Sequence, residues 1–421
     1  MTSNRMTPGA GVLILFAVLA GGVVSGCSEG NAWAGTVADS AGIRIVSNPA
    51  SSQWPEGTQP VFEEQLRIGS AGGDPNYQFG QIAAMAVGPD GTVYVLDQQA
   101  SAIRVFDAAG QFVREIGRKG SGPGELSQAA GGLLLGPGGT LLVPDPLAQR
   151  ITLFTTDGEP AGEYMMSFTD GIPLRFDQLP DLRIVQQVRV MALPGQAQTG
   201  IEPVDRLLVR AADGTLSDTL LVFPSGGTFD FAGGAAPRIR IFEPEPMWAI
   251  GLDGKLFYAV NTGYNIEVRS ADGTLERMIR KPFERQPVTD ADQQAFRDVI
   301  TELFEQQGLP PEALAAMSQM IQFADHYPAF ANLMRGPGNT LLVQHVRSAA
   351  EAAAGGLEDP RDMGSPTWDV FDAEGRLMGE VELPAKFTPL HIRSDEMWGV
   401  WRDDLDVQYV VKLKVTGLQA S

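Results

Sequence analysis

The sequence contains one cysteine and three histidines in 421 residues, so the residues on which most thiolate and imidazole chemistry depends are scarce. A single thiol, Cys27, cannot form an intramolecular disulfide or a thiolate metal site, because both need a second cysteine. The motif H-E-x-x-H is also absent, and the pattern G-x-S-x-G occurs only as GCSEG at residues 26–30, directly after the apolar N-terminal run. These observations argue against the zinc peptidases that carry the first motif and the serine hydrolases that carry the second between a strand and a helix.

Positive charge is in deficit as well. Lysine and arginine together number 31 against 51 aspartates and glutamates, which gives a formal net charge of −20 at pH 7. A surface of this charge repels nucleic-acid phosphates and anionic lipid headgroups. We therefore expect no nucleic-acid partner.

The apolar run at the N-terminus is short. It extends from Val12 to Val24, is interrupted at Gly21 and Gly22, and follows one basic residue, Arg5. A membrane-spanning helix needs about 20 apolar residues, so this length is typical of the apolar region of a signal peptide. A plain secretory signal and an unmodified anchor helix both stay open as alternatives.

The segment closes with VSGC at residues 24–27, which resembles the lipobox of bacterial lipoproteins. The resemblance implies a signal peptide over residues 1–26, lipidation of Cys27, and a tether over 27–41. The membrane would then be a partner through Cys27, with about 0.8 kcal/mol contributed by each buried methylene. Ser28 favours, by the same resemblance, the outer membrane over the inner one, facing the periplasm or the cell surface.

Turn-forming residues are abundant, with 49 glycines and 29 prolines. Between residues 79 and 117 they separate four short runs whose alternation or β-branched content predicts antiparallel strands. These runs are IAAMAVGPDG, TVYVLDQ, AIRVFDAAG and QFVREIG. The unit recurs 48 residues later, where Gly139 and Gly158 correspond to Gly91 and Gly110.

Looser copies follow, with turn glycines at Gly214, Gly273 and Gly375, and a sixth copy ends before its fourth strand. Residues 61–69 resemble a fourth strand and precede the first complete unit. We therefore expect them to pair with residues 408–415 and to complete the sixth sheet, which leaves no exposed edge. One more strand is expected at 42–48, and the repeat assigns it no neighbour.

Residues 110–154 resemble an NHL-type repeat, with a glycine-rich loop between units, a strand ending in V-x-D, and an arginine before β-branched residues. Residues 79–117 carry much of the same pattern. The resemblance implies an all-β fold, a six-bladed β-propeller over residues 42–418. It leaves the activity open, because propellers host many unrelated functions.

The lengths of the connections differ between the two faces of such a ring. If the strands of a blade are called a to d from the channel outward, connections after a and c lie on one face and those after b and d on the other. Nearly all long connections follow b or d, which favours that face as the binding surface. One of them, 287–328, has apolar residues at helical spacing and predicts a helical hairpin between blades 4 and 5. The hairpin could be packed on the rim, act as a lid, or bind a partner protein.

Residues 114–126, REIGRKGSGPGEL, have the glycine content of a phosphate-binding loop. In a P-loop, however, the lysine is followed by serine or threonine, whereas Lys119 is followed by Gly120. We interpret the stretch as the crossover between two blades. Arg118 and Lys119 are candidate contacts for an anion at the rim.

Two acidic residues recur at equivalent positions. Asp97 and Asp145 end strand b of the first two units, and Arg104 and Arg150 open strand c. Recurrence favours repeated structural contacts over a single active site. The two aspartates are also candidate ligand-binding residues.

The three histidines fall in neighbouring units. His326 precedes strand a of the fifth unit, His345 ends its strand b, and His391 lies in strand a of the sixth. This grouping fits a divalent metal at the channel mouth, where some similar NHL-like lyases place their metal ligands. Separations of 19 and 46 residues match no compact ligand motif, so three ordinary hydrogen-bonded histidines are the alternative.

Three functions follow as hypotheses. The first is a non-catalytic, lipid-anchored module that binds a small molecule, glycan or protein on its long-loop face. The second is a metal-dependent lyase or lactone-type hydrolase that uses His345 and its neighbours. The third is a structural subunit of a cell-envelope complex that docks through the helical hairpin.

Overall fold

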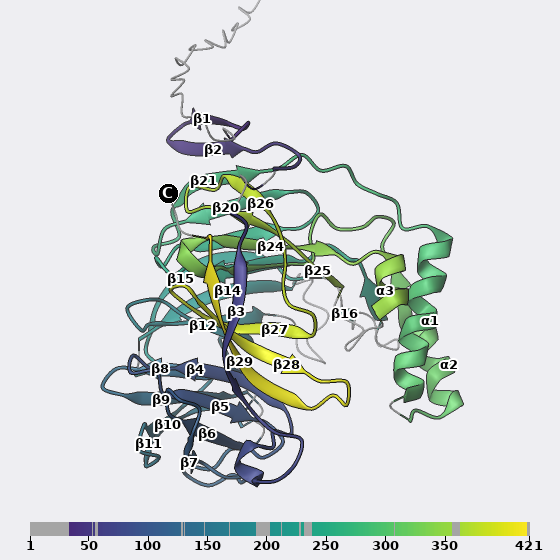
Figure 1. Cartoon of the computed structure of the whole chain (residues 1–421). Coiled ribbons are helices and arrows are strands. Elements are labelled where there is room, and N and C mark those ends of the chain that lie inside the picture. The colour runs from purple at the N-terminus through teal and green to yellow at the C-terminus, as the bar shows by residue number, and fades with distance from the viewer. Residues whose placement is uncertain are drawn as a thin grey trace, which may run out of the picture. The chain divides into compact units, whose positions relative to one another are not determined.

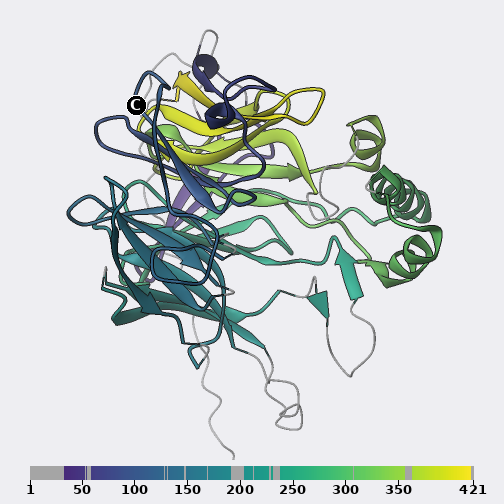
Figure 2. The ribbon, with the colours of Figure 1, turned by 90° about the horizontal axis from the view of Figure 1, so that it is seen from below.

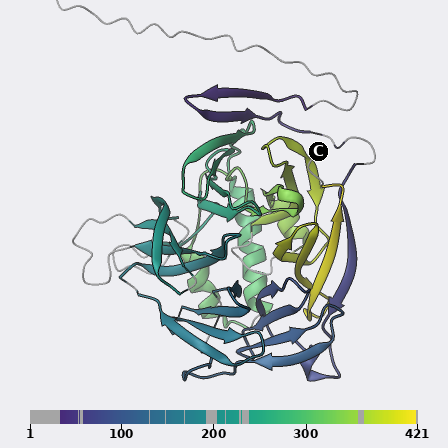
Figure 3. The same cartoon turned by 90° about the vertical axis from the view of Figure 1, so that its left-hand side faces the viewer.

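Six sheets, each built on four antiparallel strands, form a ring (Figure 3), and the chain is a six-bladed β-propeller with a cavity in its central channel. The structure is a computed structural model, and it describes residues 33–52, 54, 58–127, 129, 131–146, 148–167, 169–190, 203–211, 213–226, 229–230, 238–306, 308–355 and 363–418. The innermost strand of each sheet lines the channel, and the chain then proceeds outward through the sheet.

The first three blades follow the expected order. Blade 1 contains β4 (Ile82–Val87), β5 (Val93–Asp97), β6 (Ala102–Phe106) and β7 (Phe112–Ile116). Blade 2 contains β8 (Leu134–Gly136), β9 (Thr140–Asp145), β10 (Arg150–Thr155) and β11 (Pro160–Met165). Blade 3 contains β12 (Ile172–Gln178), β13 (Ile184–Val190), β14 (Val204–Arg210) and β15 (Leu216–Pro224).

The last three blades carry the additions to the repeat. Blade 4 contains β18 (Pro246–Ile250), β19 (Leu256–Val260), β20 (Asn265–Arg269) and β21 (Leu275–Arg280). Blade 5 contains β23 (Asn332–Arg335), β24 (Leu341–Val346), β25 (Gly364–Phe371) and β26 (Leu377–Glu382). Blade 6 contains β27 (Phe387–Arg393), β28 (Glu396–Arg402) and β29 (Gln408–Thr416), with an outer strand from elsewhere in the chain.

That outer strand is β3 (Val61–Ile68), which closes the ring. It pairs antiparallel with β29 from Val410 opposite Ile68 to Thr416 opposite Val61. The prediction that residues 61–69 lie beside 408–415 is therefore confirmed. The two strands are more than 300 residues apart in the chain, so their pairing joins the N-terminal segment to the last blade.

The strand that the repeat left without a neighbour is β2 (Ile43–Ser47). It runs parallel to β21 on the outer edge of blade 4 and forms a hairpin with β1 (Thr36–Ser40). The sequence predicted a tether over 27–41, whereas its last residues form β1. Asn48 fixes the hairpin, because its side-chain amide donates to the carbonyls of Arg280 and Gly375 and accepts from the backbone of Leu377.

The hydrophobic core lies between blades. One cluster joins Leu96 and Ile103 of blade 1 to Leu141 and Phe154 of blade 2, and all four are at most 1% exposed. Each sheet thus buries both faces against its neighbours, which explains why inner strands such as VYVLD of β5 are buried throughout.

The recurrent turn glycines have a steric cause. Gly273, between β20 and β21, has φ of +84° and a Cβ there would lie 2.5 Å from the carbonyl oxygen of Leu220 in blade 3. Only glycine satisfies both the left-handed backbone and the close approach.

A separate layer covers part of one face of the ring. It contains α1 (Asp290–Gln306), α2 (Pro311–Met320), α3 (Ala349–Gly355) and a small sheet of β16 (Phe229–Asp230), β17 (Arg238–Ile241) and β22 (Ile321–Phe323). We call these elements the cap. Figures 1 and 2 both show the three helices together at one side of the blades.

The helical hairpin predicted at 287–328 is α1 and α2. Thr289 and Asp292 form the expected N-terminal cap of α1, with the Asp292 carboxylate accepting from the Thr289 backbone at 2.9 Å. Phe296 and Ile300 are buried, so the apolar face of α1 packs against the hydrophobic cluster inside the layer of helices that we call the cap. In the described part of the chain no helix has the length and apolarity needed to cross a membrane.

Candidate functional site

The cap is assembled from three insertions that lie far apart in the sequence. They follow strand d of blade 3, strand d of blade 4 and strand b of blade 5, so all three emerge on the same face of the ring. Phe242 of the first insertion contacts Phe296 and Tyr327 of the second, with ring centroids 4.9 and 4.5 Å apart. Ala352 of the third is buried in the same cluster.

A pocket of about 370 Å³ lies where the three insertions meet the blades. We call it the cap pocket. Each insertion contributes to its wall, as do strand ends of blades 3 and 4. The lining residues are Arg189, Arg240, Ile241, Phe242, Glu243, Glu245, Pro246, Met247, Asn261, Pro328, Ala331 and Met363.

The polar groups of the cap pocket are held in place by neighbours. Arg189 makes a bidentate pair with Asp205 at 2.8 and 3.0 Å, and this hydrogen bonding raises the pKa of the arginine. Asn261 donates to the Phe330 carbonyl at 2.7 Å and accepts from the Glu245 backbone at 2.6 Å. Both arginines that line the pocket have carboxylate partners, Arg189 in Asp205 and Arg240 in Glu243 at 3.7 Å.

The central channel holds a second cavity, of about 420 Å³, lined by the innermost strands of all six blades. Most of the lining is apolar or backbone. The acidic and basic side chains of the lining are Arg175 and Asp177 on β12 and Arg335 on β23, which form a cluster. Because Asp177 and Arg335 stand at the ends of their strands, the cluster lies toward the face with short turns, opposite the cap.

His391 also lines the channel, on β27. Burial, together with the smaller effects of the nearby charges of Arg335 and Arg393, lowers the pKa of its imidazole to about 4, although Glu396 opposes the shift. The ring is therefore neutral at neutral pH.

A third cluster, between blades 4 and 5, surrounds Asp369, which is fully buried. Both carboxylate oxygens accept from Lys281, at 2.7 and 2.8 Å, and one also accepts from the Tyr264 hydroxyl. Nε2 of His345 lies 3.1 Å from the carboxylate. Burial raises the pKa of Asp369, but the contact with His345 and the charge of Lys281 outweigh burial and lower it.

His345, Asp369 and Glu380 form the one group of three potential metal ligands in the described part of the chain, with ligand atoms within 4.8 Å. Lys281 supplies the positive charge that a cation would otherwise bring to Asp369. This geometry favours a buried ion pair, whose disruption costs about 3–5 kcal/mol in proteins, over a metal site.

The structure does not bring the three histidines together. His391 faces the channel, whereas His345 turns away from it toward strand c of its own blade, and His326 forms a backbone bridge with Pro287 at the base of the cap. The sequence placed them in adjacent blades correctly, but residue spacing did not reveal that the side chains point in different directions.

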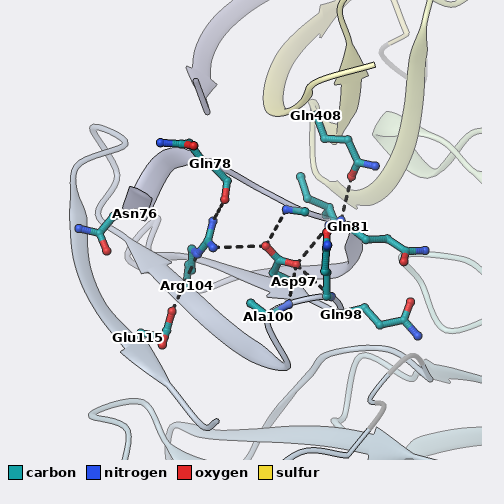
Figure 4. A network of polar contacts seen from close by, with 12 residues as sticks. Asn76, Gln78, Gln81, Asp97, Gln98, Ala100, Arg104, Glu115 and Gln408 are labelled. Atoms are coloured by element: carbon teal, nitrogen blue, oxygen red, sulfur yellow. Dashed lines mark hydrogen bonds and ion pairs between the residues drawn. The ribbon is translucent and has the colours of Figure 1, made fainter. Parts of the chain in front are cut away.

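Asp97 has a structural environment, which Figure 4 shows from close by. Its carboxylate accepts from the backbone of Gly80, Gln81, Gln99 and Ala100 at 2.9–3.2 Å and lies 3.4 Å from Arg104. The side chain is 1% exposed. These bonds fix the crossover into blade 1 and leave no surface for a ligand.

The carboxylate of Asp145 fixes the crossover into blade 2 in the same way. It accepts from the backbone and hydroxyl of Ser127, both at 2.8 Å, and is fully buried. The recurrence of these contacts at equivalent places agrees with the structural interpretation of both aspartates.

The two cations of the crossover loop differ from each other. Arg118 is exposed and pairs with Glu125 at 2.9 Å. Lys119 borders an open polar hollow with Gln81, Gln98, Gln99, Arg402 and other residues of blades 1 and 6. The loop itself is the inter-blade crossover, with Gly117 and Gly124 at positive φ.

The comparisons with known proteins agree with the fold. A family model described as a 6-bladed beta-propeller matches residues 77–131. No curated protein is similar enough in sequence to match. A Bacteroides fragilis crystal structure, named as that of a candidate exported protein, is 11% identical with a TM-score of 0.51, covering 88% of this chain and 99% of its own.

Two further solved structures are also similar to this chain. Virginiamycin B lyase from Staphylococcus aureus is 12% identical with a TM-score of 0.41, covering 84% of this chain and 99% of its own. Regucalcin, a calcium-binding protein from Agrobacterium tumefaciens, is 10% identical with a TM-score of 0.40, covering 84% and 95%. At these identities the likeness concerns the fold alone.

The pKa of His391 predicts a pH dependence of stability. The unfolded chain protonates this histidine near pH 6.5, but the folded protein does so only near pH 4. The unfolded state therefore binds more protons as the pH falls from about 6.5 to 4, and stability is lost over this range. Relative to His391→Gln, the wild type should lose up to about 2 kcal/mol more between pH 7.5 and pH 5 in urea unfolding.

Titration of the imidazole by NMR gives the control. A folded-state pKa near 4 is expected. A value above 6, or parallel pH profiles for the wild type and His391→Gln, would contradict the buried environment.

Proposed function

We propose that the protein is an exported, lipid-anchored binding module that holds a small molecule in the cap pocket. One observation carries the proposal: insertions from three separate positions converge on one face and line a single pocket. Packing alone gives no reason for three insertions to meet, since the propeller closes without them. Long loops on a rigid scaffold commonly carry binding sites.

The lining of the cap pocket indicates the class of ligand. Its apolar wall includes Phe242, Met247 and Met363, and both of its arginines are paired with carboxylates. A ligand with net charge would gain little from this arrangement. An uncharged molecule with an apolar body and a few hydrogen-bonding groups fits it best.

Export and anchoring rest on the sequence at residues 24–27 and on a likeness. The lipobox-like segment ends at Cys27, the sole cysteine. The similar Bacteroides fragilis structure is named as a candidate exported protein. NHL-type repeats and attachment to the outer membrane belong to the same proposal, and a protein partner at the helical hairpin stays a prediction.

The metal-dependent enzyme has less support. Its expected ligands, His326, His345 and His391, do not share a site, and Asp369 beside His345 is neutralised by Lys281. A catalytic metal needs several ligand atoms and an open coordination position. Binding without turnover is therefore the function that the geometry supports best.

Filling the cap pocket should abolish binding there. We expect the uncharged fluorescent probe N-phenyl-1-naphthylamine to bind the wild type saturably, and Ala331→Trp to weaken this binding at least tenfold because the indole occupies the pocket. Ala316→Trp on the exposed side of α2 is the matched control and should leave the fluorescence titration unchanged, as should Arg335→Gln in the channel. Equal affinity in the wild type and a folded Ala331→Trp variant would refute the cap pocket as the site.

Anchoring has its own test. Cys27→Ser should abolish incorporation of labelled palmitate and move the protein from the membrane fraction to the soluble extracytoplasmic fraction. If the variant stays in the membrane fraction and the wild type takes up no label, the segment is an unmodified anchor helix instead.

A further inference from the structure

The channel carries positive charge in a protein whose formal charge is −20. Its lining contains two arginines, one aspartate and a neutral histidine, so one positive charge is uncompensated there. The channel walls are protein on every side, which strengthens the field of a fixed charge relative to that at an open surface.

Each of the two guanidinium groups is positioned by a hydrogen bond to a backbone carbonyl and keeps N–H donors that have no acceptor among the described residues. Arg175 donates from Nη1 to the Trp248 carbonyl at 2.8 Å and stacks 4.3 Å above its indole ring. Arg335 donates from Nη1 to the Ile250 carbonyl at 3.4 Å. Within the described residues, Nε of both arginines and Nη2 of Arg335 have no hydrogen-bond acceptor.

Neither arginine forms a close ion pair with Asp177. Arg175 and Arg335 approach its carboxylate only to 3.7 and 3.5 Å. In the same blade, the structural pair of Arg189 and Asp205 is bidentate at 2.8 and 3.0 Å. Asp177 therefore positions the arginines rather than satisfying their donors.

The arginines remain accessible from within the cavity. The side chain of Arg175 is 45% exposed and that of Arg335 is 23% exposed, although both belong to channel-lining strands. His391 adds an imidazole with no hydrogen-bond partner in the described part of the chain. Alanine, leucine and methionine side chains complete the wall, among them Met85, Leu135 and Leu390.

We propose that the channel binds an organic monocarboxylate, with the carboxylate between Arg175 and Arg335 and the apolar body against the leucine and methionine wall. Guanidinium donors match carboxylate oxygens in geometry. One net positive charge matches one negative charge, whereas a phosphate carries more charge than the site balances. A cavity of about 420 Å³ accommodates a small organic molecule. This site is separate from the cap pocket and independent of the function proposed for it.

The test uses octanoate as the probe, with the purified full-length protein in calorimetric titrations. Octanoate should bind with one-to-one stoichiometry, and uncharged octanamide and inorganic phosphate should each bind at least tenfold more weakly. Arg335→Gln and Arg175→Gln should each weaken octanoate binding at least tenfold. Arg335→Lys, which keeps the charge, should retain part of it.

Arg114→Gln is the matched control, because Arg114 also pairs with an aspartate, Asp157 at 2.8 Å, but on the outer strand of blade 1. It should not change the affinity, and neither should Ala331→Trp in the cap pocket. Unchanged octanoate binding in both folded channel variants would overturn the proposal, as would tighter binding of phosphate. If Arg335→Gln does not fold, the octanoate affinities of Arg175→Gln and Arg335→Lys test the proposal in its place. Loss of octanoate binding in Ala331→Trp alone would move the carboxylate to the cap pocket and also contradict the proposal.

Discussion

The hydrogen-bonded ladder between β3 and β29 holds the ring together, because it completes blade 6 with a strand that lies more than 300 residues earlier in the chain. Without β3, blade 6 would expose the edge of β29, and Val410, Val411 and Leu413 would lose part of their cover. Closure also fixes which strand ends share a face. The cap pocket and the channel cluster both exist because strands from different blades are held at set positions around one axis.

The two cavities differ in their electrostatics, and this difference follows from where their arginines find partners. Arg189 beside the cap pocket makes a close bidentate pair with Asp205, a carboxylate that is itself fully buried. Arg175 and Arg335 share one distant carboxylate and keep free donors. Arginine thus has a structural role beside the cap pocket, whereas in the channel it is available to bind a ligand. Asp369 shows the structural case again, with Lys281 at 2.7 Å compensating its charge.

Much of the fold could be predicted from the sequence because the repeat is local. Turn glycines equivalent to Gly110 recur in the first five blades, V-x-D strand ends mark the first two, and Thr289 with Asp292 marks the start of α1. The position of β2 could not be predicted, since a parallel strand on an outer edge leaves no periodic signal. Helix α3 was missed although Ser348 and Glu351 form a capping box. The channel cluster was missed too, although IPLRFDQ of β12 carries charges where β4 of blade 1 reads IAAMAV.

Ring closure is the claim on which the rest depends, and cross-linking tests it directly. Glu63 and Lys414 are opposite one another on β3 and β29, at a separation that a disulfide can span. In a Cys27→Ser background, Glu63→Cys with Lys414→Cys should form an intramolecular disulfide on mild oxidation, detected by non-reducing peptide mapping, and should raise the unfolding temperature. Gln65→Cys with Lys414→Cys should link poorly. Failure of the first pair to link, or equal linking of both pairs, would contradict the closed ring.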